Sequence, residues 1–317
     1  MEEIDKTLPS VVIFHADDCW ENDFIHYDLF PRFPILNVST CMYNRLKETN
    51  SFNDFFTENN IRPGYSILIF SSNYHKACVW TLIPLTEWLK PLIMVHLSDE
   101  WGLDYAKGYK EAYNIELSKH TKLILRNYHH PEHNLSQFNN IECIPLGYSN
   151  GMVTQSSVSL DMPKEPYKRQ YIWSFIGNIN KYRHELMEVF TNSDLGKHIT
   201  KNNATKVELY EIYKDTIFVP IGRGNKVLEC FRIYEALIAG AIPVIVGNKE
   251  EVMSCFLFEN NPPWIFANTW DAALAECKRL YVSPNELRDR QLFIIEHWKN
   301  RIHQIRRKIM DIVESRE

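Results

Sequence analysis

Two short segments of the sequence place glycine and basic side chains directly after an apolar run, an arrangement that can bind phosphate. In the first, the apolar run YIWSFI (171–176) is followed by Gly177 and Asn178, and then by Lys181 and Arg183. Glycine lets a ligand approach the backbone closely, and the two cations can give an anion charge-assisted hydrogen bonds. The alternative interpretation is an ordinary strand-to-helix turn with solvated cations.

The second segment is the loop VPIGRGN (219–225), which contributes Pro220, Gly222, Arg223, Gly224 and Asn225. Its glycines fit neither the P-loop pattern nor the GxGxxG pattern, so the common nucleotide-binding fingerprints are absent. A loop with two glycines and an arginine ahead of a helix can still hold a pyrophosphate through its backbone N–H groups.

Arg232 and Glu235 add a positive charge and a carboxylate to the predicted helix 229–239. A spacing of three residues places both side chains on one face of a helix. The arginine can meet a phosphate, and the carboxylate offers two acceptor oxygens to the hydroxyls of a ribose. The alternative is a local Arg–Glu pair that contributes only a few tenths of a kcal/mol.

The elements that must position these residues follow an α/β pattern. In the first half, runs that are apolar at their centres predict buried parallel strands at 10–15, 66–71, 92–97, 122–126 and 141–145. Helical patterns lie between them at 46–58, 76–89 and 107–119. Strands that alternate with helices predict a doubly wound sheet, in which ligands bind beyond the carboxyl ends of the strands.

The stretch 148–170 is polar, rich in serine and without a helical period, which predicts a domain linker. After it, strands are expected at 171–176, 216–220, 242–246 and 264–266, and helices at 182–191, 207–214, 229–239, 249–256 and 269–281. From Pro284 the chain predicts one long helix with an apolar stripe formed by Ile295, Trp298, Ile302, Ile305, Ile309 and Ile312. We expect this stripe to pack on the body of the protein. The expected domains are 1–150, 165–285 and the terminal helix 286–317.

The composition is that of a folded globular protein: 317 residues, 45% of them hydrophobic and 24% charged. A net charge of −5 argues against a dedicated nucleic-acid binder. Seven dispersed cysteines indicate free thiols in a reducing compartment. His129, His130 and His133 lack carboxylates or cysteines at a suitable spacing, so they are interpreted as loop residues and no metal site is expected. We find no signal-peptide pattern and no transmembrane segment, which predicts a soluble, cytoplasmic protein.

The stretch FRIYEALIAGAIPVIV (231–246), preceded by FVPIGRG (218–224), resembles the C-terminal motif of the exostosin-like glycosyltransferases. It is most similar to the ribitol xylosyltransferase-like branch of that family. Further segments agree with this branch, namely HLSDEWG (96–102), LILRNYHH (123–130), IPLGY (144–148) and WSFIGNINKYR (173–183). The resemblance covers roughly residues 92–250.

The resemblance implies a GT-B architecture, in which two Rossmann-like domains face a cleft and a long C-terminal helix packs back on the N-terminal domain. It also implies an inverting, metal-independent enzyme without a cofactor, whose C-terminal domain binds a nucleotide sugar. Arg183 matches the phosphate-contacting arginine of the family, and Glu235 matches its ribose-contacting glutamate. One departure is Cys230, because many exostosins carry a serine there that can contact phosphate.

An inverting transfer needs a general base to take the proton from the acceptor hydroxyl. Asp99 and Glu100 directly follow a predicted strand of the N-terminal domain, and we expect Asp99 to be the base and Glu100 to hold a loop or an acceptor hydroxyl. The alternative is that both only cap the next segment. Asp18, with Glu21 nearby, is a rival base. Arg126, at the end of another strand, is expected to bind donor phosphate or orient a carboxylate.

Together these features predict a hexosyl- or pentosyltransferase that moves a sugar, xylose by resemblance, from a UDP-linked donor to a hydroxyl of an oligosaccharide or glycoprotein glycan. Arg183, Arg232 and the backbone of 222–225 would meet the pyrophosphate charge, the role that a metal cation would otherwise fill. The alternative is a catalytically silent nucleotide- or sugar-binding protein of the same fold. The missing anchor is compatible with a microbial or virus-encoded relative.

Overall fold

The computed structural model describes residues 3–15, 20–49, 51–71, 85–98, 100, 119–129, 138–224, 227–256 and 263–315. These residues fall into two compact units. The first unit consists of Met1–Glu21, Leu29–Leu146 and Gln304–Glu317, and the second unit of Asn22–Asp28 and Gly147–His303. The expected linker 148–170 therefore clusters with the second unit, while the domain boundaries of the sequence analysis stay a prediction.

The first unit contains a parallel, 6-stranded sheet with the strand order β2-β1-β3-β4-β5-β6. Its strands are β1 (Ser10–His15), β2 (Ile35–Ser39), β3 (Ser66–Ser71), β4 (Ile93–Leu97), β5 (Leu123–Arg126) and β6 (Ile141–Cys143). Every residue of β4 and β5 is buried, as their apolar sequences predict. The edge strand β2 escaped prediction because its sequence ILNVS includes polar residues and buries only Val38.

The first helix predicted in the N-terminal half differs from the one observed. The single helix expected at 46–58 is wrong: the structure has α1 (Thr40–Glu48) and α2 (Phe52–Glu58) instead. The Thr49 hydroxyl donates a 2.8 Å hydrogen bond to the carbonyl of Arg45, a local bond that competes with helix continuation at the point where α1 ends. The expected helix at 76–89 is described only from residue 85, and the one at 107–119 lies outside the described residues except at its end.

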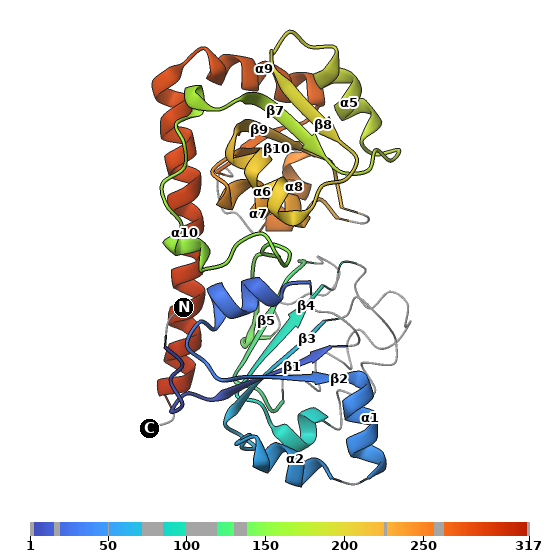
Figure 1. The fold of residues 1–317 in the computed structure, drawn as a ribbon, viewed down its shortest axis with the longest axis vertical. Helices are drawn as coiled ribbons and strands as arrows, with labels where there is room; N and C mark the ends of the chain where they lie inside the picture. Colours follow the sequence, from blue (N-terminus) through green and yellow to red (C-terminus); the bar gives the residue numbers. More distant parts are fainter. Residues whose placement is uncertain are drawn as a thin grey trace. The chain divides into compact units, whose positions relative to one another are not determined.

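The second unit contains a parallel, 5-stranded sheet with the order β11-β10-β9-β7-β8. Its strands are β7 (Tyr171–Ile176), β8 (His198–Lys201), β9 (Thr216–Ile221), β10 (Ile242–Val246) and β11 (Ile265–Ala267). Its helices are α5 (His184–Thr191), α6 (Lys206–Lys214), α7 (Phe231–Ile238), α8 (Lys249–Phe256) and α9 (Trp270–Tyr281). Helix α5 packs against α9, and α6 against α7; Figure 1 shows these two pairs on opposite faces of the sheet.

Both sheets share one strand order when the strands of each unit are counted from its start: second, first, third, fourth, fifth. In such a doubly wound sheet the direction of winding reverses between the first and third strands, and the crevice at their carboxyl ends is where ligands bind. These strands are β1 and β3 in the first unit and β7 and β9 in the second. The predicted pair of doubly wound α/β sheets is confirmed.

The last helix, α10 (Pro284–Glu314), is 31 residues long and is drawn in red in Figure 1. Its buried stripe is formed by Leu287, Gln291, Ile294, Trp298, Ile302, Ile305, Ile309 and Val313. Ile294 and Val313 thus replace the expected Ile295 and Ile312, which are only half-buried. From Gln304 onward the helix belongs to the first unit, where Lys308 pairs with Glu142. The expected packing of this helix on the N-terminal part of the protein is confirmed.

Candidate functional site

The switch point of the second sheet lies where β7 and β9 end. The pairing between these strands is made at Tyr171 with Thr216 and at Trp173 with Phe218, and goes no further along β9. Pro220, buried in β9, has no N–H to donate to a ladder, which suits a strand that separates from its neighbour here. The two loops that follow the strands therefore define the candidate site.

Gly177, the first residue after β7, makes room for the side chain of Arg232. Its φ of +145° is a conformation that favours glycine, and a Cβ atom placed on it would lie 2.7 Å from Nη2 of Arg232. The Nε of Arg232 donates a 3.1 Å hydrogen bond to the carbonyl of Ile176. The arginine from the first turn of α7 is thus held against the carboxyl end of β7.

Arg183 connects the loop after β7 with the loop after β9. Its Nη1 donates to the carbonyl of Asn178 at 2.6 Å, and its Nη2 donates to the carbonyl of Arg223 at 3.3 Å. A Cβ atom on Gly222 would lie 2.5 Å from Cγ of Arg183. Only glycine leaves space for the arginine at that position, so both glycines that the sequence singled out serve to admit an arginine.

Arg183, which is buried, and Arg232, which is half-buried, form a centre of positive charge. Arg183 is 7% exposed, and burial together with the positive charge of Arg232 lowers its pKa. Its Nε is buried without a hydrogen-bond partner. Within the described ranges, no carboxylate forms an ion pair with Arg183 or Arg232. Like charges without a counter-ion in a buried place favour the binding of an anion.

The remaining candidate residues of the two loops differ in their contacts and exposure. Arg223 pairs with Glu251 at 2.6 Å. The ammonium of exposed Lys181 lies 4.8 Å from the ring centre of Tyr182. Asn178 is exposed, and its backbone carbonyl serves Arg183, while Gly224 is half-buried and Asn225 lies outside the described residues.

Glu235 does not form the local pair with Arg232 that the sequence allowed. Its carboxylate is 2% exposed, and Oε1 accepts hydrogen bonds from the hydroxyl of Ser149 and, at 3.2 Å, from the ammonium of Lys206. Sequence reasoning missed Ser149 and Lys206. They lie 86 and 29 residues from Glu235, a separation that carries no periodic signal.

Cys230 occupies the N-cap position of α7 without making a side-chain cap. Its Sγ lies 3.9 Å from the carbonyl of Gly222, and burial raises the pKa of the thiol. The thiol is therefore neutral near pH 7 and adds no negative charge beside the arginines.

In the first unit, buried polar residues follow the ends of three strands. Glu21, after β1, is fully buried and accepts a hydrogen bond from the hydroxyl of Ser98, which follows β4 in a left-handed conformation at φ +56°. Glu100 is 9% exposed and Arg126, the last residue of β5, is 2% exposed. The expected base Asp99 and its rival Asp18 lie outside the described residues, as do His130 and His133.

Metal-ligand clusters and membrane spans were also sought. Over the described ranges, His, Cys, Asp and Glu side chains nowhere gather in threes that could hold a metal ion. In the same residues, no helix has the length and apolar character needed to cross a membrane.

Comparison with known proteins gives a family match over the C-terminal half of the chain and structural matches over nearly its whole length. Residues 154–316 match the family described as the RXYLT1 C-terminal domain. A curated relative, ribitol-5-phosphate xylosyltransferase 1 of Danio rerio, is 23% identical over 173 residues, which is 46% of this chain. The match spans only 38% of the length of that relative.

Solved structures share the fold at low sequence identity. A glycosyltransferase from Rickettsia africae has a TM-score of 0.58 at 12% identity and covers 97% of this chain and 98% of its own. Anabaena HepE in complex with UDP has a TM-score of 0.56 at 8% identity, covering 97% of this chain and 100% of its own. An alpha-glucosyltransferase in complex with UDP and DNA has a TM-score of 0.56 at 11% identity, with coverage of 97% and 100%. The expected GT-B fold is confirmed.

Proposed function

Because the chain belongs to the family of the RXYLT1 C-terminal domain, we propose that it is a glycosyltransferase whose second unit binds a nucleotide-sugar donor at the ends of β7 and β9. The observation that carries the proposal is the pair formed by buried Arg183 and half-buried Arg232, which form no ion pair with a carboxylate among the described residues. A diphosphate brings the negative charge that such a pair lacks.

UDP is the first nucleotide to consider. Two of the similar solved structures contain it, although their low identity supports only a shared fold. Arg183 and Arg232 would bind its diphosphate with charge-assisted hydrogen bonds, and the backbone at Gly222–Gly224 would approach it closely. Glu235, on the same helix as Arg232, would accept hydrogen bonds from the ribose.

The transfer itself would proceed by attack of an acceptor hydroxyl oxygen on the anomeric carbon, with inversion. The bond from that carbon to the phosphate oxygen breaks, and the nucleoside diphosphate leaves with the bonding electrons. Arg183 and Arg232 would stabilise the negative charge that develops on the leaving group. The proton of the acceptor passes to a carboxylate of the first unit, for which Asp99 is the leading candidate and Asp18 and Glu100 are the rivals.

Xylose is the proposed donor sugar, with a glycan hydroxyl as acceptor. The support is the match to a protein named for xylosyl transfer to ribitol-5-phosphate, and that match covers less than half of either chain. A catalytically silent binding protein is the alternative function.

Thermal unfolding in the presence of nucleoside diphosphates and nucleotide sugars tests the binding claim. A ligand at one hundred times its Kd adds about 2.7 kcal/mol to the free energy of unfolding, so UDP and UDP-xylose should raise the Tm clearly. Release of UDP from UDP-xylose in the presence of glycan acceptors then tests catalysis. Asp99→Asn should abolish this release and leave UDP binding intact. Binding by the wild-type protein without turnover for any acceptor or donor would favour the silent alternative.

A further inference from the structure

Lys206 lies beside the buried carboxylate of Glu235, at its solvent side. The Lys206 ammonium is 3.2 Å from Oε1 of Glu235. The lysine side chain is 44% exposed, whereas that of Glu235 is only 2% exposed. An ammonium that is open to solvent can donate further hydrogen bonds, because it has three N–H groups and only one is used here.

The second carboxylate oxygen of Glu235, Oε2, is also available to a ligand. Both the Ser149 hydroxyl and the Lys206 ammonium contact Oε1, and Oε2 accepts no hydrogen bond from any residue that the structure describes. A carboxylate offers about four acceptor positions. Glu235 and Lys206 therefore present a spare acceptor and a spare donor next to each other.

The lysine is held in place by local structure. It is the first residue of α6, whose N-cap Thr205 accepts a 3.2 Å hydrogen bond from the N–H of Glu208. A Cβ atom added to Gly151 would lie 3.4 Å from Cβ of Lys206, so the stem of the lysine runs along that glycine. These contacts fix the base of the lysine side chain, and its ammonium contacts Glu235 from there.

We propose that Lys206 is a further donor-binding residue, which together with Glu235 recognises the vicinal diol of a ribonucleotide and discriminates against 2′-deoxyribose. The proposal rests on the proposed function, since it names the part of the donor that this site reads. Each hydroxyl of a diol both donates and accepts a hydrogen bond. The 3′-hydroxyl donates to Oε2 of Glu235, and the 2′-hydroxyl accepts from the ammonium of Lys206.

The loss of one hydroxyl leaves one of the two charged groups without its ligand partner. Sites that hydrogen-bond a substrate hydroxyl reject analogues without it, because the polar groups of the site are then unpaired. A hydrogen bond to a charged group corresponds to roughly a tenfold to hundredfold change in affinity. A preference for UDP over 2′-deoxy-UDP of at least about tenfold is therefore expected.

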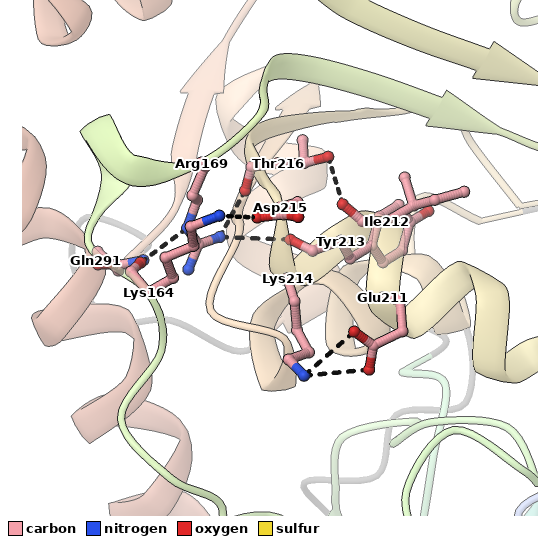
Figure 2. A network of polar contacts seen from close by, with 9 residues as sticks. All are labelled: Lys164, Arg169, Glu211, Ile212, Tyr213, Lys214, Asp215, Thr216 and Gln291. Carbon is pink, nitrogen blue, oxygen red and sulfur yellow. Dashed lines mark hydrogen bonds and ion pairs between the residues drawn. The ribbon is translucent and has the colours of Figure 1, made fainter.

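Isothermal titration of the whole chain with UDP and 2′-deoxy-UDP tests the proposal. In Lys206→Met the Kd for UDP should rise about tenfold and that for 2′-deoxy-UDP less than about threefold, so that the preference is lost. Lys206→Arg keeps a charged donor and should keep most of the preference. The matched control is Lys214→Met at the other end of α6, where Lys214 pairs with exposed Glu211 at 3.1 Å (Figure 2); it should bind both nucleotides like the wild type.

The possible outcomes distinguish the role proposed for Lys206 from the proposed donor site. If the wild-type protein binds UDP and Lys206→Met keeps the same preference over 2′-deoxy-UDP, the role of Lys206 is overturned while the donor site stands. If Lys206→Met weakens UDP-xylose but not UDP, the diol belongs to the transferred sugar and the ribose assignment is overturned. If the wild-type protein binds neither nucleotide, the proposed function is overturned together with the inference.

Discussion

Two buried arginines lie at opposite ends of strand β9 and differ in the charges around them. Arg169, at the start of the strand, is 8% exposed and donates to the carbonyls of Lys164 at 2.9 Å and Thr216 at 2.5 Å (Figure 2). Burial lowers its pKa to about 10, and the nearby carboxylate of Asp215 acts in the opposite direction. Arg183, beyond the end of the strand, is 7% exposed and also donates to backbone carbonyls, but the charge with the largest effect on its pKa is that of Arg232.

Unsatisfied donors do not separate these arginines, because each keeps one buried nitrogen without a partner, Nη2 in Arg169 and Nε in Arg183. The arginines differ in the sign of the charge that most affects their pKa, which is negative for Arg169 and positive for Arg183. A nearby carboxylate offsets part of the charge of a buried cation, whereas a like charge beside it favours the binding of an anion. Burial alone therefore does not mark a binding residue.

The largest change in stability is expected for substitution of Arg169, at the start of β9. Arg169→Met should lower the free energy of unfolding by about 3 kcal/mol, because several buried carbonyls lose a charged donor. Urea unfolding measures this loss. The Kd for UDP, measured on the folded variant, should stay within about twofold of the wild-type value. A large loss of UDP affinity with little change in stability would break the comparison.

Arg183→Met should weaken UDP binding and change stability little, the opposite of Arg169→Met. The Kd for UDP should rise about 30-fold, which corresponds to about 2 kcal/mol, because charge-assisted hydrogen bonds to the diphosphate are lost. Stability should change by less than about 1 kcal/mol, since removal of the like charge beside Arg232 offsets the lost bonds. Arg183→Lys is the control that keeps the charge but not the fork of donors, and its Kd should fall between the two.

Two glycines with positive φ allow a similar comparison between a position at the candidate site and a position away from it. Gly177 follows β7 and Gly196 precedes β8, with φ values of +145° and +111°. A Cβ atom would meet Arg232 at the first and Ile172 at the second. Both changes to alanine should destabilise the fold by about 1–2 kcal/mol through backbone strain. Only Gly177→Ala should also weaken UDP binding, by about tenfold, and equal UDP affinities in the two variants would contradict this account.

The smallest effect is expected for Cys230→Ser. The thiol makes no cap for α7, and serine is a preferred N-cap residue. The free energy of unfolding of the variant, measured by chemical denaturation, should be about 0.5–1 kcal/mol higher than that of the wild type. If the new hydroxyl also reaches the phosphate, the Kd for UDP should fall rather than rise. A destabilised variant would show that the cap geometry is not accessible to serine.

The parts of the fold that could be predicted from sequence are those whose burial is uniform. β4, β5 and β9 are buried at every residue and apolar at their centres, and the predicted bounds lie within one residue of those observed. The edge strand β8 alternates exposed and half-buried residues over HITK, which leaves no apolar run to detect. The break between α1 and α2 was also missed, because a helical pattern continues across it.

The candidate site was predictable where it follows from strand ends, and not where it depends on tertiary contacts. Gly177, Gly222 and Arg183 were found because they come directly after strands or in the turns that follow. The contact of Lys206 with Glu235 joins the first residue of α6 to the second turn of α7, and the pairing of Arg223 with Glu251 joins a loop to α8. Neither follows a sequence period, so only the packed chain reveals them.

The central claim is that Arg183 and Arg232 together bind a nucleoside diphosphate. A crystal structure of the wild-type protein grown with UDP tests it most directly. The account predicts that diphosphate oxygens lie within hydrogen-bond distance of both guanidinium groups, beyond the ends of β7 and β9. UDP bound at another place, or crystals at saturating UDP with no nucleotide beside these arginines, would contradict it.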